Sequence, residues 1–129
     1  MAKQQPEYHL QKQVCDYLNL QYSKVLYMSD TVASVKLTMM QAVRNKAIQK
    51  DGFKCPDVII FEPKGIYHGL FIELKVKPIL KRSGELLKNK HIEGQQKTIS
   101  DLNALNYFAT FAVGFDEAKK IIDNYFSLP

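Results

Sequence analysis

Two stretches decide the fold of this chain: Pro56-Asp57-Val58-Ile59-Ile60-Phe61 and Gly69-Leu70-Phe71-Ile72-Glu73-Leu74-Lys75-Val76. Short runs rich in Val, Ile and Phe are typical of β-strands. Turn-forming residues stand between the two runs, in Pro63-Lys64-Gly65 and His68-Gly69. We therefore expect two adjacent strands joined by a turn.

Each predicted strand carries an acid, Asp57 in the first and Glu73 in the second. Side chains alternate along a strand, so Glu73 and Lys75 face the same side. Carboxylate oxygens suit Mg²⁺ or Mn²⁺, and a lysine can hold and polarise an attacking water. The ordinary alternative is that Glu73-Leu74-Lys75 is a solvated strand edge. Its apolar neighbours favour a central strand, where an unpaired acid is costly, so phosphodiester hydrolysis at Asp57, Glu73 and Lys75 is the working hypothesis.

The whole chain, residues 1–129, is expected to form one domain with an ordinary core. Its composition, 46% hydrophobic and 24% charged, is that of a globular protein. The start, Met1–Glu7, lacks the apolar core of a signal peptide, and no apolar run approaches the roughly 20 residues that span a bilayer. Cys15 and Cys55 lack zinc-type spacing and are expected to be buried thiols in a reducing cytoplasm, with no membrane partner.

Positive charge is concentrated in one segment. The chain has a net charge of +5 and a pI near 9.1, which favours a polyanionic partner. Between Lys75 and His91 the only acid is Glu85, and the excess there equals that of the whole chain. We expect a basic loop at about 78–93. Five basic residues in or next to this loop are expected to contact phosphates: Lys77, Lys81, Arg82, Lys88 and Lys90. The alternative is a solvated loop, which charge runs usually are.

A helix is predicted over residues 5–20, with Pro6 at its start. Its apolar face consists of Leu10, Val14, Tyr17 and Leu18. Glu7 falls on the same stripe. It either favours the helix dipole from the first turn or reaches the acid pair as a further ligand.

A second helix is predicted over Gly94–Asn106, with Ile99 and Leu102 on its buried stripe. Gln95 falls on this stripe, so it is selected to meet the active site, although it could equally pin a neighbouring strand. Asn106 suits the left-handed position that ends a helix.

The remaining elements follow from the same signals: a strand at Val25–Met28, a loop at Ser29–Lys36, a helix at Leu37–Lys50, a strand at Tyr107–Val113 and a closing helix capped by Asp116. The closing helix looks structural, with a stripe of Ala118, Ile121, Ile122, Tyr125 and Phe126. The order α-β-α-β-β-α-β-α predicts an α/β fold in which helices flank a mixed sheet.

This order, with Pro56-Asp57 and Glu73-Leu74-Lys75, resembles the PD-(D/E)XK nuclease superfamily. More narrowly, the chain resembles a stand-alone VRR-NUC domain of the phage and bacterial type. The resemblance covers roughly residues 5–126 and rests also on Gly52–Val58, on the helix with Gln95 and on Phe115–Ala118 leading to Tyr125. It implies a restriction-endonuclease-like fold and a divalent-metal-dependent DNA endonuclease, located in the bacterial cytoplasm, or in the host cytoplasm if phage-encoded.

The resemblance also assigns roles. Asp57, Glu73 and the backbone carbonyl of Leu74 match the metal ligands, and Lys75 matches the residue that activates water. Glu7 matches an acid often found on the first helix, and Gln95 matches the glutamine after the catalytic strand. Small members of this family are typically homodimers that cut branched DNA such as four-way (Holliday) junctions, which a two-fold dimer suits.

The chain departs from the family pattern in two places: the first is conservative for backbone geometry, and the second concerns substrate preference. Asn106 stands where a glycine is usual, and the usually short link after the catalytic strand is the long basic segment. A nicking, flap-cutting or restriction-type nuclease on the same fold stays open, as does a catalytically inert nucleic-acid-binding module. A recombination or packaging accessory that acts through protein contacts is a third alternative, with no sequence feature in its favour.

Overall fold

The computed structural model describes residues 5–30 and 36–129. Its elements are α1 (Pro6–Gln21), β1 (Tyr27–Ser29), α2 (Met39–Ala47), β2 (Val58–Ile60), β3 (Leu70–Lys75), α3 (Lys90–Ala104), β4 (Phe108–Val113) and α4 (Gly114–Phe126). The expected order of helices and strands is confirmed.

The four strands form one mixed sheet in the order β1-β2-β3-β4. The predicted strand pair is present: β2 and β3 are antiparallel, with Ile59 opposite Phe71. β3 and β4 are parallel, with Glu73 opposite Phe111. A parallel pair needs a crossover connection, and α3 provides it.

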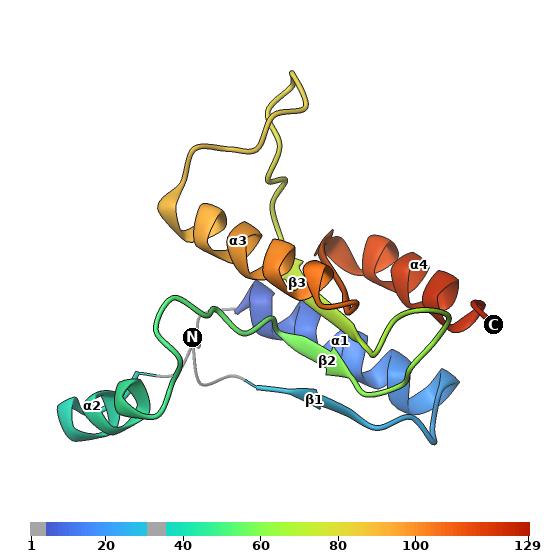
Figure 1. Ribbon diagram of the computed structural model, residues 1–129, viewed down its shortest axis with the longest axis horizontal. Helices are drawn as coiled ribbons and strands as arrows, with labels where there is room; N and C mark the ends of the chain where they lie inside the picture. Colours follow the sequence, from blue (N-terminus) through green and yellow to red (C-terminus); the bar gives the residue numbers. More distant parts are fainter. Residues whose placement is uncertain (1–4, 31–35) are drawn as a thin grey trace.

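The helices cover both faces of the sheet (Figure 1). The larger core packs α1 and α4 against one face, which Leu70, Ile72 and Leu74 of β3 supply. The smaller core packs α3 against the other face, where Phe71 of β3 lies. Because side chains alternate along β3, Glu73 and Lys75 lie on the α3 face.

Two helix starts differ from the expectation. α3 begins at Lys90 because the side chain of Asn89 caps it and accepts the N–H groups of His91 and Ile92 at 2.8 and 3.3 Å. Residues 90–93 of the expected basic loop are therefore helical. α4 begins at Gly114, so Asp116 lies in its first turn and is not the N-cap. An acid at that position still favours the helix dipole.

The other elements differ less. β1 starts two residues later than expected, and α2 is shorter at both ends. α2 has no buried residue, and its apolar residues Met40 and Val43 are exposed. Part of the expected loop at Ser29–Lys36, residues 31–35, lies outside the described residues.

Three further expectations can be compared with the structure. Asn106 has the left-handed conformation predicted for it, with φ 66°. The two cysteines are not the buried thiols expected, because Cys15 is half-buried and Cys55 is exposed. No helix within residues 5–30 and 36–129 has the length and apolar character needed to cross a membrane.

Candidate active site

The two acids of the motif meet at the ends of β2 and β3. Oδ2 of Asp57 accepts the backbone N–H of Leu74 at 2.8 Å. The carboxyl groups of Asp57 and Glu73 are also close enough for each to influence the pKa of the other. Asp57 precedes Val58, which faces the larger core, so alternation turns Asp57 toward α3. Both acids therefore lie on one face of the sheet.

Burial makes this acid pair hard to ionise. Glu73 is only 6% exposed. Burial raises its pKa to about 8, with a further contribution from the charge of Asp57 and an opposing one from Lys75. Burial also raises the pKa of Asp57, while the hydrogen bond from Leu74 acts against the rise. Without a cation between them, the two carboxyl groups therefore retain a proton near neutral pH.

Lys75 lies beside the pair at the end of β3. Its positive charge opposes the rise in the pKa of both Asp57 and Glu73. Its Nζ lies 5.9 Å from the ring centroid of Phe111, on the neighbouring β4. The half-buried Lys75 thus presents an ammonium group on the same face as the two acids.

Gln95 reaches the pair from α3. Its side chain is 6% exposed, and its Nε2 donates a 2.7 Å hydrogen bond to Oε1 of Glu73. The same Nε2 lies 3.1 Å from Nε2 of His91, one turn earlier on the helix. Oε1 of Gln95 is buried and has no hydrogen-bond partner among the described residues. The amide is thus held at the site with an unused acceptor.

Glu7 and Leu74 supply two further oxygen atoms. Glu7 is exposed on the first turn of α1 and lines the same cleft as the acid pair, and its charge raises the pKa of Asp57. The β2–β3 register, continued by two residues, sets Pro56 opposite Leu74. A proline has no N–H to donate, so Pro56 cannot pair with the carbonyl of Leu74 in this register.

The side chains at this site do not by themselves form a complete ligand set for a hard divalent cation. Within the described part of the chain, no three or more His, Cys, Asp or Glu side chains are grouped so that they could hold a metal ion. Two neighbouring carboxyl groups and the carbonyl of Leu74 nevertheless form an all-oxygen donor set, which Mg²⁺ and Mn²⁺ prefer. Water commonly completes the coordination of such ions.

The acid pair opens into a cleft that several elements line. The walls come from the start of α1, the end of α2 with residues 49–57, the end of β3, and His91 with Gln95 on α3. The backbone before β2 is fixed by Ser29, whose Oγ donates to the carbonyl of Asp57 at 2.8 Å and accepts from Gln11 at 2.5 Å.

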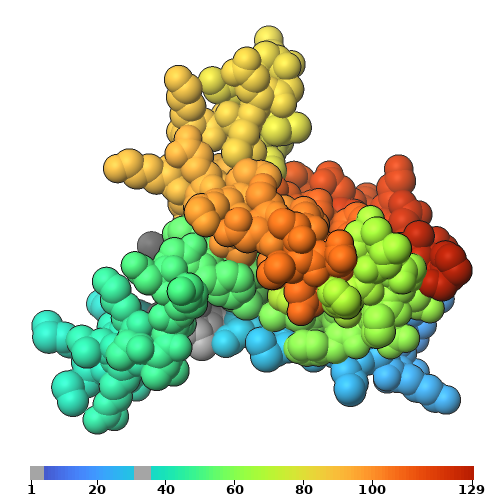
Figure 2. All heavy atoms as spheres, viewed as in Figure 1, coloured from blue at the N-terminus to red at the C-terminus, as the bar shows by residue number. Residues whose placement is uncertain are grey.

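The basic segment forms a loop that folds back on itself as a hairpin. The N–H of Lys81 donates to the carbonyl of Glu85 at 2.7 Å, and the N–H of Leu87 to that of Ile79 at 2.8 Å. Ile79 is buried and anchors the hairpin, while its basic side chains are exposed: Lys77, Lys81, Arg82 and Lys88, with Lys90 at the start of α3. The hairpin and α2 project from the body as two separate arms (Figure 2).

Cleft residues that the sequence analysis missed include His91, Lys54, Lys46 and Lys50. The sequence analysis gave His91 no role at the site. The sequence spacing indicated its position, because His91 stands four residues before Gln95. The two residues share one helix face once α3 is seen to begin at Lys90. The lysines lacked a local pattern that placed them at the cleft.

The fold has a counterpart among solved structures. A "VRR_NUC domain protein" matches with a TM-score of 0.62 and 23% sequence identity, over 98% of this chain and 93% of that chain. This match confirms the VRR-NUC fold that the sequence resembles. Neither a scan against protein-family models nor a search of curated proteins finds a match.

Proposed function

We propose that this chain is a divalent-metal-dependent DNA endonuclease that hydrolyses phosphodiester bonds. The observation that carries the proposal is the buried pair of Asp57 and Glu73 with Lys75 beside it. A buried acid pair destabilises a fold unless a partner compensates its charge. A cation and a phosphate would provide that compensation, and the VRR_NUC fold is consistent with such a site.

The proposed metal ligands are Asp57, Glu73, the carbonyl of Leu74 and Glu7 from the opposite wall of the cleft. When bound, Mg²⁺ or Mn²⁺ would acidify a water and neutralise charge on the scissile phosphate. Gln95 fixes Oε1 of Glu73 by its 2.7 Å hydrogen bond, which leaves the other carboxylate oxygen for the cation. Gln95 is therefore a positioning residue unless its free oxygen contacts water or substrate.

Lys75 is the proposed donor to the attacking water. Its ammonium lies beside the carboxylates without being part of the metal ligand set, so it can orient the nucleophile and stabilise charge on the phosphate. No side chain needs to form a covalent intermediate in this scheme. The proton of the attacking water leaves to solvent or to the acid pair.

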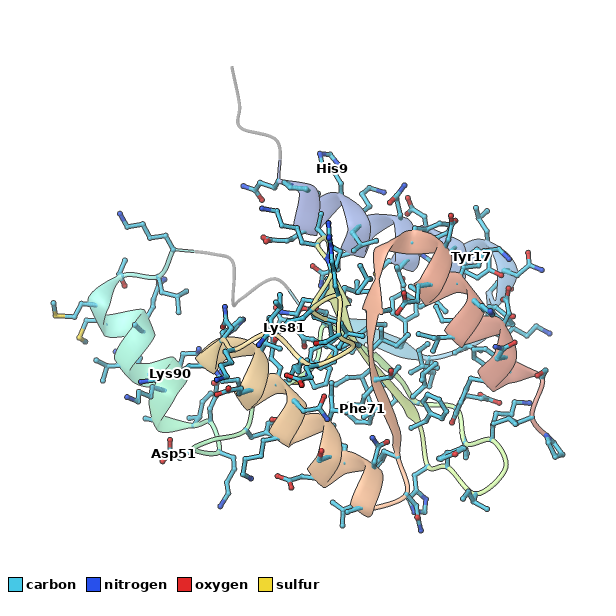
Figure 3. All side chains as sticks on the ribbon, turned by 90° about the horizontal axis from the view of Figure 1, so that it is seen from above. His9, Tyr17, Asp51, Phe71, Lys81 and Lys90 are labelled. Atoms are coloured by element: carbon cyan, nitrogen blue, oxygen red, sulfur yellow. The ribbon has the colours of Figure 1, made fainter. Side chains whose placement is uncertain are left out.

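The proposed substrate is branched DNA. The exposed lysines and arginine of the hairpin form a basic arm next to the cleft, which suits phosphate contacts that depend on shape more than on base sequence. The hairpin that carries Lys81 stands away from the sheet (Figure 1), so it is seen end-on in the view from above, in which Lys90 marks the start of α3 (Figure 3). A homodimer with two such sites would match the two-fold symmetry of a four-way junction.

The test compares labelled four-way junction, flap and plain duplex of matched sequence, each with Mg²⁺, Mn²⁺ or EDTA. Metal-dependent incision, strongest on the junction, supports the proposal, and Asp57→Asn serves as the inactive control. Equal cutting of duplex would instead favour a nicking or restriction-type nuclease. Binding without incision under every condition would favour the inert binding module and overturn the enzyme.

A further inference from the structure

The side chain of Lys54 crosses α3 at Gly94. A Cβ atom added to Gly94 would lie 2.5 Å from Cε and 3.0 Å from Cδ of Lys54, and 3.7 Å from its Nζ. No methyl group fits in that space while Lys54 keeps its position. Glycine inside a helix is less favourable than alanine, so its presence at this crossing is explained by the passage of the lysine stem.

The backbone of Lys54 is attached to the same helix. Its N–H donates a 3.0 Å hydrogen bond to Oγ1 of Thr98, whose side chain is 2% exposed. Thr98 stands one turn after Gly94, so the main chain and the side chain of Lys54 are both held against α3. Lys54 is itself an exposed residue, so its side chain lies along the surface of α3.

Lys54 is also part of the cleft that contains the acid pair. Lys54 lines it together with the acid pair, His91 and Gln95. Its positive charge acts on both Glu73 and His91, whose pKa values it lowers. Lys54 takes part in none of the ion pairs that the described residues form.

The surroundings of Lys54 can accept an anion. The amino end of a helix carries partial positive charge within its first turn, and the first turn of α3 contains Lys90, His91 and the acid Glu93. Lys54 adds a positive charge beside this end of the helix. A phosphate bound here would meet two groups that attract anions, a helix amino end and a lysine.

We propose that Lys54 binds a non-bridging phosphate oxygen of the DNA backbone. We also propose that Gly94, which has no side chain, leaves the space that Lys54 needs to reach this position. This inference rests on the proposed function, because it takes DNA as the substrate. The phosphate is expected to be a neighbour of the scissile one, since Lys54 lies on the α3 side of the acid pair. Lys54 is thus a substrate-binding residue, and Gly94 is a positioning residue that acts through it.

The experiment measures DNA binding without cleavage, in EDTA, as a function of salt concentration. Lys54→Ala should raise Kd and reduce the slope of log K against log salt by about 0.9, the value for one phosphate contact on duplex DNA. Gly94→Ala should change Kd and slope in the same direction, because the added methyl group displaces the lysine. Its thermal stability should stay equal or rise, since alanine is the better helix former.

The double variant tests the positioning directly. With Lys54 shortened to alanine, the three atoms nearest to a methyl group at position 94 are removed, so Gly94→Ala should have no further effect on Kd in the Lys54→Ala background. Lys97→Ala is the matched control, because Lys97 is an exposed lysine of the same helix that is paired with Asp101 at 2.8 Å. It should keep the parent slope.

The outcomes separate this inference from the proposed function. A parent protein that neither binds nor cuts DNA would remove the proposed function itself. A parent that binds, with Lys54→Ala at the parent Kd and slope, overturns the phosphate contact. An effect of Gly94→Ala that persists in the double variant overturns the positioning role. Should Gly94→Ala not fold, Lys54→Ala alone still decides the contact.

Discussion

Asp57 and Leu74 are joined by a 2.8 Å hydrogen bond between a carboxylate oxygen and a backbone N–H. Leu74 is the residue between Glu73 and Lys75, so the acid of β2 is attached directly to the strand that carries the other two candidate catalytic groups. The relative positions of the three side chains therefore depend on strand pairing, which is rigid, and not on the long loop between the strands.

The acid pair gives the first prediction. Asp57→Asn and Glu73→Gln should each abolish metal-dependent cleavage, because each removes one negative ligand while it preserves the shape of the side chain. Circular dichroism and DNA affinity in EDTA should remain near those of the parent. Calorimetric titration with Mn²⁺ checks the reason, since both variants should lose most of the metal affinity. Parent-level cleavage by either variant would contradict the site assignment.

The raised pKa of Glu73 gives a second prediction, on stability. Its pKa is about 8 in the folded protein and near 4.5 in an unfolded chain. Between these values the folded state binds more protons than the unfolded state, so the free energy of unfolding falls as pH rises through this window. We expect the Tm of the metal-free protein to fall from pH 5 to pH 8 more steeply than that of Glu73→Gln.

Metal should reverse this trend. Cation binding requires the pair to lose its proton, so Mg²⁺ should raise Tm more at pH 8 than at pH 6. Scanning calorimetry with Mg²⁺ or EDTA at both values provides the measurement. The same Tm shift at both values would show that proton release is not coupled to metal binding.

Lys75 gives the third prediction. Lys75→Ala should lower kcat on the order of 10²–10³-fold, the usual cost of one well-placed electrostatic contact in the transition state. DNA and metal affinity should change little. Lys75→Arg should restore little activity, since a planar guanidinium does not reproduce a compact ammonium donor. Single-turnover kinetics separates the chemical step from binding, and parent rates for the alanine variant would remove Lys75 from the mechanism.

The basic arm gives the fourth prediction. Changing Lys81, Arg82, Lys88 and Lys90 to glutamine together should weaken DNA binding and flatten its salt dependence, because fewer counterions are released. The control changes four lysines outside both the basic arm and the cleft, Lys24, Lys64, Lys97 and Lys120. This control lowers the net charge by the same amount and should keep most of the salt dependence of DNA binding. Equal loss in the two variants would mean that overall charge, and not the arm, attracts DNA.

Much of the sheet and part of the site could be predicted from local pattern. The apolar runs around Asp57 and Glu73 indicated two strands, because β-branched residues favour this conformation and the turn residues lay between them. The helical stripe through Ile99 and Leu102 selected Gln95, which the structure places against Glu73 at 2.7 Å. Periodicity determines which face of an element a residue occupies, and this was sufficient for these residues.

What could not be predicted depends on contacts between distant residues or on a single cap. The Asn89 cap moved the start of α3, and with it His91 entered the cleft. The placement of Lys54 depends on Gly94 and Thr98, about forty residues away in sequence, as the hydrogen bond to Thr98 shows. The hairpin could not be predicted because its many charged residues are typical of a solvated loop, whereas backbone hydrogen bonds give it its shape.

The hairpin closes on itself between two fixed points, the end of β3 at Lys75 and the Asn89 cap of α3. Loop-closure cost grows slowly with length, by about 0.6 kcal/mol for each doubling. Insertions or deletions at the hairpin tip can therefore alter its reach at little cost in stability and without moving Asp57 or Glu73. If the proposed function holds, the range of DNA shapes that are accepted can diverge through changes in loop length while the proposed hydrolytic centre stays the same.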